Sequence, residues 1–195
     1  FYNFSTWWFN NAGAQGDVNI GPNASVKLKT LGGIAFPAIY QHYTGIYIHK
    51  GASYIAEAEG NAVRFDRTSG VNRKFLYVFE DASIALSSRQ SQPIMEWNTP
   101  ADVYSAPGSE FYLIGKSVSN LNTMVRADSA YSVDSSLVLN SPLRYDIRND
   151  NSRYKAFNVR NDFRFEILNS DIETWNAGNL ELDKNPDNSN FLATY

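Results

Sequence analysis

The stretch GDVNIGPNASVKLKT, from Gly16 to Thr30, alternates apolar and polar residues, breaks at a small polar turn and then alternates again. Alternation of this kind predicts a β-strand with one buried face, and glycine, proline and asparagine are typical of a tight turn. Taken by itself, the stretch predicts a strand, a corner and a second strand. The same arrangement returns along the chain, so the stretch is one copy of a repeat.

The repeat can be followed through most of the chain. Each copy contains a short apolar strand, a small polar bend and a second alternating strand. Four serines, Ser25, Ser53, Ser83 and Ser119, are matched in the alignment of the first four copies. The six copies are Val18–Thr30, Tyr47–Gly60, Tyr77–Ser88, Tyr112–Asn122, Val138–Asn149 and Glu166–Asn176. A third strand lies between successive copies, with sequences that start at Ala38, Val63, Met95, Val125 and Val159.

Units of about 25–35 residues that contain three short strands are typical of a parallel β-helix. The sequence therefore predicts an all-β solenoid of about six coils, in which equivalent side chains stack into columns. The alternative is a β-sandwich or jelly roll, because many short strands with turn signals are typical of those folds too. The fixed order of three strand types favours the solenoid.

We expect residues 1–195 to form a single solenoid domain that belongs to a longer protein, because the chain starts with Phe1. The aromatic residues 1–16 lie outside the repeat and are expected to be a cap or the end of a preceding coil. Two segments, Ser87–Pro93 and Thr99–Glu110, lengthen the third unit. The second holds two prolines and a glycine and is predicted to be an exposed loop.

Composition excludes several classes of function. The net charge of −3 argues against broad nucleic-acid binding, which needs a basic face. The absence of cysteine excludes disulfides, thiol catalysis and cysteine-based zinc sites. No apolar run is long enough to span a membrane, so we expect no membrane insertion.

The outward positions of the third strand carry charges at regular intervals. Stacked coils would bring neighbouring columns of opposite charge together, and each exposed ion pair would contribute about 0–1 kcal/mol. One predicted column holds Arg64, Glu96, Arg126 and Arg160, and the next holds Asp66, Asn98, Asp128 and Asp162.

Three interpretations of this face remain open. It is a solvated surface that prevents lateral association of sheets, a shallow polar surface that binds carbohydrate or a second copy of the protein, or a calcium site built from aspartates. Arginine pairs with carboxylated sugars, and tyrosine stacks on sugar rings. Calcium prefers oxygen ligands, but no aspartate-rich loop with calcium spacing is present. Tyr104, between Pro100 and Pro107, is a further candidate contact residue.

Catalysis is not expected. The two histidines, His42 and His49, adjoin no serine or carboxylate in a triad pattern, and the common motifs of hydrolases, metalloproteases and phosphate-binding loops are missing. We therefore predict no catalytic residue, no metal site and no cofactor. A pair of acids that converges in space, as in glycosidases, is left open because sequence does not reveal it.

The stretches GDVNIGPNASVKLKT, GIYIHKGASYIAEAEGNAVRFD and NSDIETWNAGNLELDKNPDNS together resemble the pectate-lyase-like adhesive domain of Gram-positive, lactobacillus-type surface proteins. The chain is also similar in style to the binding regions of serine-rich repeat adhesins. The resemblance covers nearly the whole chain. It implies a right-handed parallel β-helix, display on the cell wall, and adhesion without catalysis.

The favoured hypothesis is a surface adhesin domain that binds polysaccharide or host glycans, or that aggregates cells by self-association. Weak contacts repeated along a rod become strong through avidity. The alternative is a β-helix enzyme that degrades polysaccharide, such as a lyase or a tailspike-type depolymerase. A purely structural spacer is the third hypothesis.

Overall fold

The computed structural model describes residues 7–9, 17–29, 39–41, 45–58, 60–66, 73–88, 93–115, 124–141, 143–147, 157–167 and 172–174, and the regular elements within these ranges are all β-strands. The strands form three parallel sheets of six strands each. Sheet A holds β1 (Trp7–Phe9), β4 (Ile39–Gln41), β7 (Val63–Phe65), β10 (Met95–Trp97), β13 (Val125–Ala127) and β16 (Phe157–Val159). Sheet B holds β2 (Val18–Ile20), β5 (Gly45–Ile48), β8 (Lys74–Val78), β11 (Ala101–Ser105), β14 (Ser136–Leu139) and β17 (Arg164–Ile167). Sheet C holds β3 (Ser25–Lys29), β6 (Ser53–Ala58), β9 (Ser83–Ser88), β12 (Glu110–Gly115), β15 (Leu143–Ile147) and β18 (Ile172–Thr174).

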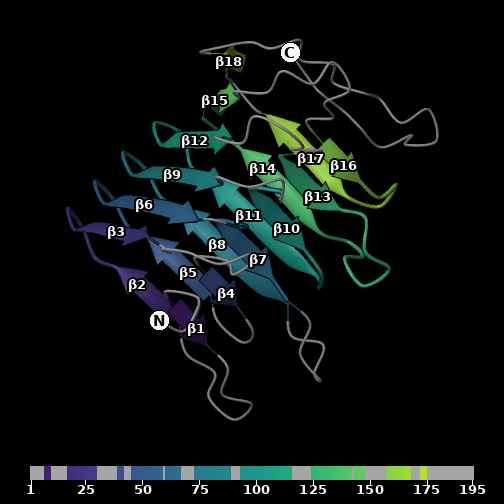
Figure 1. Ribbon diagram of the computed structural model, residues 1–195. Coiled ribbons are helices and arrows are strands. Elements are labelled where there is room, and N and C mark those ends of the chain that lie inside the picture. The colour runs from purple at the N-terminus through teal and green to yellow at the C-terminus, as the bar shows by residue number, and fades with distance from the viewer. Residues whose placement is uncertain are drawn as a thin grey trace.

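Each turn of the chain contributes one strand to each sheet, and every strand pairs in parallel with its equivalents in the neighbouring turns (Figure 1). This confirms the predicted parallel β-solenoid and excludes the β-sandwich, whose strands pair antiparallel. Four turns, from β4 to β15, have a neighbour on both sides. The predicted count of about six coils includes the two end turns, and the right-handed sense stays a prediction.

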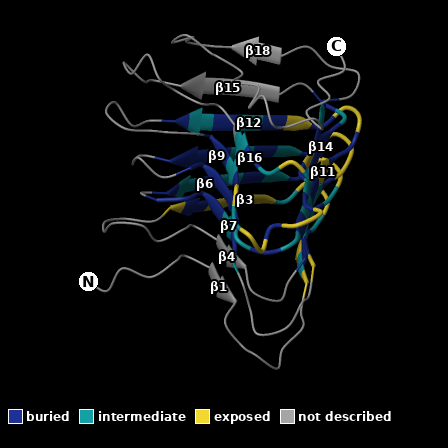
Figure 2. Ribbon diagram, turned by 90° about the vertical axis from the view of Figure 1, so that its right-hand side faces the viewer, coloured by how far each residue is buried: buried dark blue, intermediate teal, exposed yellow. Residues whose placement is uncertain are grey.

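The interior is filled by columns of apolar side chains that stack from turn to turn. One column runs Val18, Ile46, Leu76, Val103, Leu137 and Phe165 along sheet B. In sheet A, Trp97 lies 5.1 Å from Phe65 between ring centroids and donates a hydrogen bond from Nε1 to the carbonyl of Ala101. Buried residues lie mainly in the strands, and exposed residues lie mainly in the segments that connect them (Figure 2). The apolar residues that alternate with the predicted outward charges of the third strand are fully buried, as a two-residue period requires: Val63, Phe65, Met95, Trp97, Val125 and Ala127.

The corner between sheets B and C is the turn that the opening stretch predicts. Four turns close with a backbone hydrogen bond from the fourth residue to the first, at 2.9–3.2 Å. The third residue of each has a positive φ of 54–76°, as a type II turn requires, and proline occupies the second position twice. The turns are Gly21–Ala24, His49–Ala52, Phe79–Ala82 and Ala106–Ser109.

The fourth copy of the repeat begins earlier than predicted. Ser83 pairs with Glu110 in the next turn, whereas Ser119 lies outside the described residues. The segment predicted as an exposed loop forms β11, the corner Ala106–Ser109 and the start of β12. The prediction was wrong because Pro107 and Gly108 were interpreted as loop residues, although they are the second and third residues of the same type II turn.

Candidate functional site

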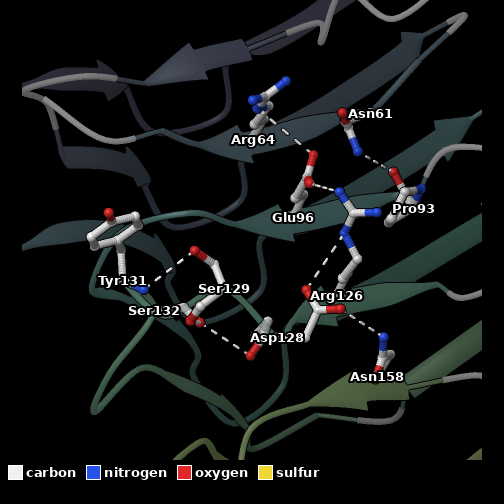
Figure 3. A network of polar contacts seen from close by, with 11 residues as sticks. Asn61, Arg64, Pro93, Glu96, Arg126, Asp128, Ser129, Tyr131, Ser132 and Asn158 are labelled. Carbon is white, nitrogen blue, oxygen red and sulfur yellow. Dashed lines mark hydrogen bonds and ion pairs between the residues drawn. The ribbon is translucent and has the colours of Figure 1, made fainter.

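The outer face of sheet A carries four of the predicted charged residues, Arg64, Glu96, Arg126 and Asp128, in a network of polar contacts (Figure 3). Strand pairing places Arg64, Glu96 and Arg126 in one column. Glu96 lies between the two arginines and pairs with both, with Oε2 at 3.7 Å from Nε of Arg64 and Oε1 bound by Nη2 of Arg126. Arg126 also pairs with Asp128 at 3.8 Å, and Arg64 pairs with Asp66 at 3.7 Å.

The last turn breaks the predicted columns. The sequence alignment matched Val159 with Val125, but Val125 pairs with Phe157, and Val159 pairs with Ala127. The predicted alignment would have turned the polar Asn161 inward opposite Ala127, and the observed register places Val159 there instead. The slip moves Asn158 into the place predicted for Arg160, and Asn158 donates a hydrogen bond to Asp128 at 2.9 Å.

Arg160 therefore lies level with Asp128 and not with Arg126, because its backbone N–H donates to the carbonyl of Ala127. Its guanidinium donates to both carboxylate oxygens of Asp162, at 3.1 and 3.4 Å. The structure thus brings Arg64, Glu96 and Arg126 into the predicted column, with Asp66 and Asp128 beside them, and places Arg160 and Asp162 in a separate pair.

Glu96 was expected on an exposed surface, and this was wrong. Its strand position does face outward, but the two arginines cover it and leave only 3% of the residue exposed. An acid held between two guanidinium groups neutralises part of their charge and orients their hydrogen bonds inward. This arrangement is suited to holding successive turns together. Ligand binding by these residues stays a prediction.

The outer face of sheet B carries a column of three tyrosines, which we call the tyrosine column: Tyr47, Tyr77 and Tyr104. Tyr104 was expected to lie in a loop, but it is an outward residue of β11 and is 36% exposed. The ring centroids of Tyr47 and Tyr77 are 5.5 Å apart, and those of Tyr77 and Tyr104 are 6.1 Å apart with an edge-on orientation. The register of the coils thus makes an aromatic surface from residues about thirty positions apart in sequence.

Neighbouring groups hold these rings in place. Phe75 stacks beside Tyr77 with centroids 5.7 Å apart. Gly45 lies under the ring of Tyr47, where a Cβ atom would approach Cε2 of that ring to 2.6 Å, so a side chain at this position would displace the ring. Burial raises the pKa of Tyr77, and the charge of Asp102 raises it further. The phenol therefore keeps its proton at neutral pH and remains a hydrogen-bond donor.

A hollow of about 620 Å³ opens beside the tyrosine column, over β11, β14 and β17. Arg73 binds Asp102 with both Nε and Nη2, the latter at 2.7 Å from Oδ1, and also donates to the backbone carbonyl of Asp134. The hydroxyl of Ser136 donates to Asp102 at 2.6 Å. The residues that line the hollow include Arg73, Tyr77, Asp102, Tyr104, Ser136 and Arg164.

One side of the hollow is lined by Arg164, which takes part in a second bidentate ion pair. Arg164 donates from Nε and Nη2 to the two carboxylate oxygens of Glu166, at 2.5 and 2.8 Å. The hydrogen bond from Arg164 lowers the pKa of Glu166 and raises that of Arg164, so both groups stay ionised at neutral pH. The hollow therefore offers fixed donors and acceptors beside aromatic rings, which is the chemistry that binds polyhydroxylated ligands.

Sequence reasoning named Tyr47 and Tyr104 as exposed aromatic residues and favoured Tyr104 as a contact residue, but it did not align them with Tyr77 in one column. Tyr47 and Tyr77 are the penultimate residues of their strands, in the positions equivalent to Tyr104. Aligning the corners Gly21–Ala24 and Ala106–Ser109 would have placed the tyrosines in one column. The signal was present in the sequence, but the misplaced fourth copy concealed it.

Comparisons with protein-family models, with curated proteins and with solved structures found no significant match to the chain. The resemblance inferred from the repeat therefore stays a prediction. Within the described part of the chain, no group of three or more His, Cys, Asp or Glu side chains is placed to hold a metal ion. Those same residues include no helix that is long and apolar enough to cross a membrane.

Proposed function

We propose that the chain is a non-catalytic adhesive domain that binds polysaccharide or glycan chains through the outer face of sheet B. The observation that carries this proposal is the tyrosine column beside a hollow with fixed ion pairs. Aromatic rings stack on the apolar faces of sugars, and the paired carboxylates and guanidinium groups supply acceptors and donors for sugar hydroxyls.

The solenoid supports the proposal in a second way. Its successive turns repeat the same outward positions at the spacing of neighbouring strands, about 4.8 Å, so a long ligand meets similar groups along its length. Repeated weak contacts on many copies displayed together become strong through avidity. Display on the outside of a bacterial cell, as the resemblance implies, belongs to the same proposal.

Binding is tested by affinity electrophoresis of the whole chain in gels that contain galactan, xylan, mannan, dextran or polygalacturonate. We expect retardation by at least one of these polymers, and loss of that retardation in Tyr77→Ala and Tyr104→Ala. Tyr112→Ala is the matched control, because Tyr112 is an outward tyrosine of sheet C. Equal retardation of all three variants, or no retardation of the native chain by any polymer, would overturn the proposal.

The enzyme hypothesis is tested on the same polymers, with and without calcium. New reducing ends or unsaturated sugar products would show that the chain cleaves its ligand and would contradict the non-catalytic function. Sedimentation velocity of the native chain separates self-association from glycan binding. Self-association that is lost in Arg126→Ala and kept in Tyr104→Ala would indicate that the adhesive face lies on sheet A and not on sheet B.

A further inference from the structure

The outer face of sheet B has a step in side-chain size across three successive strands. The middle strand, β14, presents two short side chains, whereas β17 presents two long ones and β11 presents the long Tyr104 beside the short Asp102. The outward pairs are Asp102 and Tyr104 on β11, Ser136 and Val138 on β14, and Arg164 and Glu166 on β17. We call the space over Ser136 and Val138 the notch. It is the part of the hollow where the tyrosine column stops.

The notch has the width of a single ring. Neighbouring strands lie about 4.8 Å apart, so the backbones of β11 and β17 are separated by about 9.6 Å. A flat ring packed between two walls needs about 7–8 Å, because each contact between carbon atoms is optimal at about 3.5–4.0 Å. Tyr104 on β11 and Arg164 on β17 line the hollow on either side of Val138. The residue in register with Tyr104 across Val138 is Glu166, which Arg164 binds.

The charges around the hollow disfavour an anionic ligand. The hollow is lined by two cationic and three anionic side chains, Arg73 and Arg164 against Asp102, Asp134 and Asp162, so it carries a net charge of −1. In each arginine, the guanidinium edge that would grip a carboxylate already holds one, Asp102 or Glu166. A uronic acid would have to displace one of these carboxylates before it could pair with an arginine.

A neutral polyol meets no such obstacle. Asp102 accepts three hydrogen bonds, two from Arg73 and one from Ser136, whereas an ionised carboxylate offers about four acceptor positions. The carboxylate of Asp134 lies on an exposed residue at the rim of the hollow. Both carboxylates accept from hydroxyl donors, which uncharged sugars supply and which a carboxylate group does not.

We propose that the notch binds one ring of a neutral sugar, with a ring face against Tyr104 and hydroxyl groups donating to Asp102 and Asp134. This inference rests on the glycan-binding function proposed above. It adds the position of the subsite and the class of the ligand, a neutral and not a uronic-acid polysaccharide.

The test is the variant Val138→Tyr, which extends the tyrosine column by one turn and fills the notch. Val138 lies at an outward position in register with Tyr104 and lines the hollow, where its neighbours leave only 9% of it exposed, so a longer side chain at this position is directed into the hollow. We expect affinity for the neutral polymer that retards the native chain to fall about tenfold or more, as for loss of a central contact. Val138→Thr is the matched control, because it keeps the size of the side chain and therefore keeps native retardation.

Each outcome of this experiment decides something different. If Val138→Tyr binds like the native chain while Tyr104→Ala does not, the ligand lies along the tyrosine column and the notch is not a subsite. If polygalacturonate binds more tightly than every neutral polymer, the proposed ligand class is wrong. If Tyr104→Ala also binds normally, the proposed glycan-binding face on sheet B is wrong. Should Val138→Tyr not fold, Ser136→Gln fills the notch from the neighbouring outward position and carries the same expectation.

Discussion

Lys74 is a lysine that points into the core of the solenoid, and it offers the sharpest test of the packing. It is the first residue of β8, at an inward position in register with Ala101, and it is 0% exposed. Its backbone N–H donates to the carbonyl of Pro100 at 3.0 Å. Burial lowers the pKa of the ammonium group from 10.5 to about 8, because the charged form loses its hydration.

The magnitude follows from that change. A pKa that falls from 10.5 in the unfolded chain to about 8 in the folded one corresponds to about 3 kcal/mol of lost stability at pH 7, where both states carry the proton. Methionine has a similar length and no charge, and replacing a buried charged group with an apolar one is often stabilising. We therefore expect Lys74→Met to be more stable than the native chain by about 3 kcal/mol at neutral pH.

The effect has a defined pH dependence. Between pH 8 and 10.5 the unfolded state binds more protons at Lys74 than the folded state, so the stability of the native chain rises with pH in this window. The advantage of Lys74→Met therefore shrinks above pH 8 and disappears near pH 10.5. Thermal unfolding followed by circular dichroism measures it, and an advantage of about 3 kcal/mol corresponds to about 6–12 °C in Tm for a chain of this size.

The control is Lys50→Met, at an exposed corner where the lysine pairs with Glu80 and Asp81 and is 66% exposed. We expect this variant to show no comparable gain in stability at pH 7. A difference between Lys74→Met and the native chain that stays constant over this window would refute the reasoning. So would a loss of stability in Lys74→Met at pH 7.

Two further predictions concern the corners and the charged face. Gly51→Ala should lose about 1–2 kcal/mol in urea unfolding, because φ is +69° and the new Cβ would approach Oδ1 of Asn23 to 2.4 Å. Gly21→Ala, with no atom within 4 Å of the new Cβ, should be close to neutral, and equal losses would count against the turn geometry. Glu96→Gln should lose about 1–2 kcal/mol, less than for a fully buried pair because both of its arginine partners reach solvent. The matched variant Glu80→Gln, at an exposed corner, should leave the free energy of unfolding unchanged. If Glu96→Gln also leaves it unchanged, the network around Glu96 does not stabilise the fold.

The repeat and the inward positions were predictable because they depend on local patterns. Apolar and polar residues alternate with the two-residue period of a strand, and glycine, proline and asparagine mark the corners. The opening stretch with Gly21–Ala24 therefore predicted β2, the corner and β3 correctly. The prediction for the segment from Pro100 to Gly108 was wrong because its prolines were interpreted as signs of an irregular loop. One of them, Pro107, occupies the second position of a type II turn instead.

The candidate sites were harder to predict because each depends on register. Arg160 was placed in the column of Arg126 by a match of two valines, and a slip of two residues preserves the alternation that supported the match. Only the pairing of Val159 with Ala127 shows that the slip keeps Asn161 out of the interior. The notch at Val138 is likewise invisible until the strands on both sides are known.

By itself, the sequence favoured a parallel solenoid of three-strand turns over a β-sandwich, and it indicated which side chains of the regular copies point inward and where one corner lies. These features follow from a side-chain period of two and from turns that tolerate a positive φ, both properties of residues close together in the chain. The tertiary structure alone decided which residues become neighbours across turns, and so created the tyrosine column, the notch and the buried Glu96. The physical reason is that register is chosen by how well the inward side chains of successive turns fill one interior, a choice made among residues some thirty positions apart.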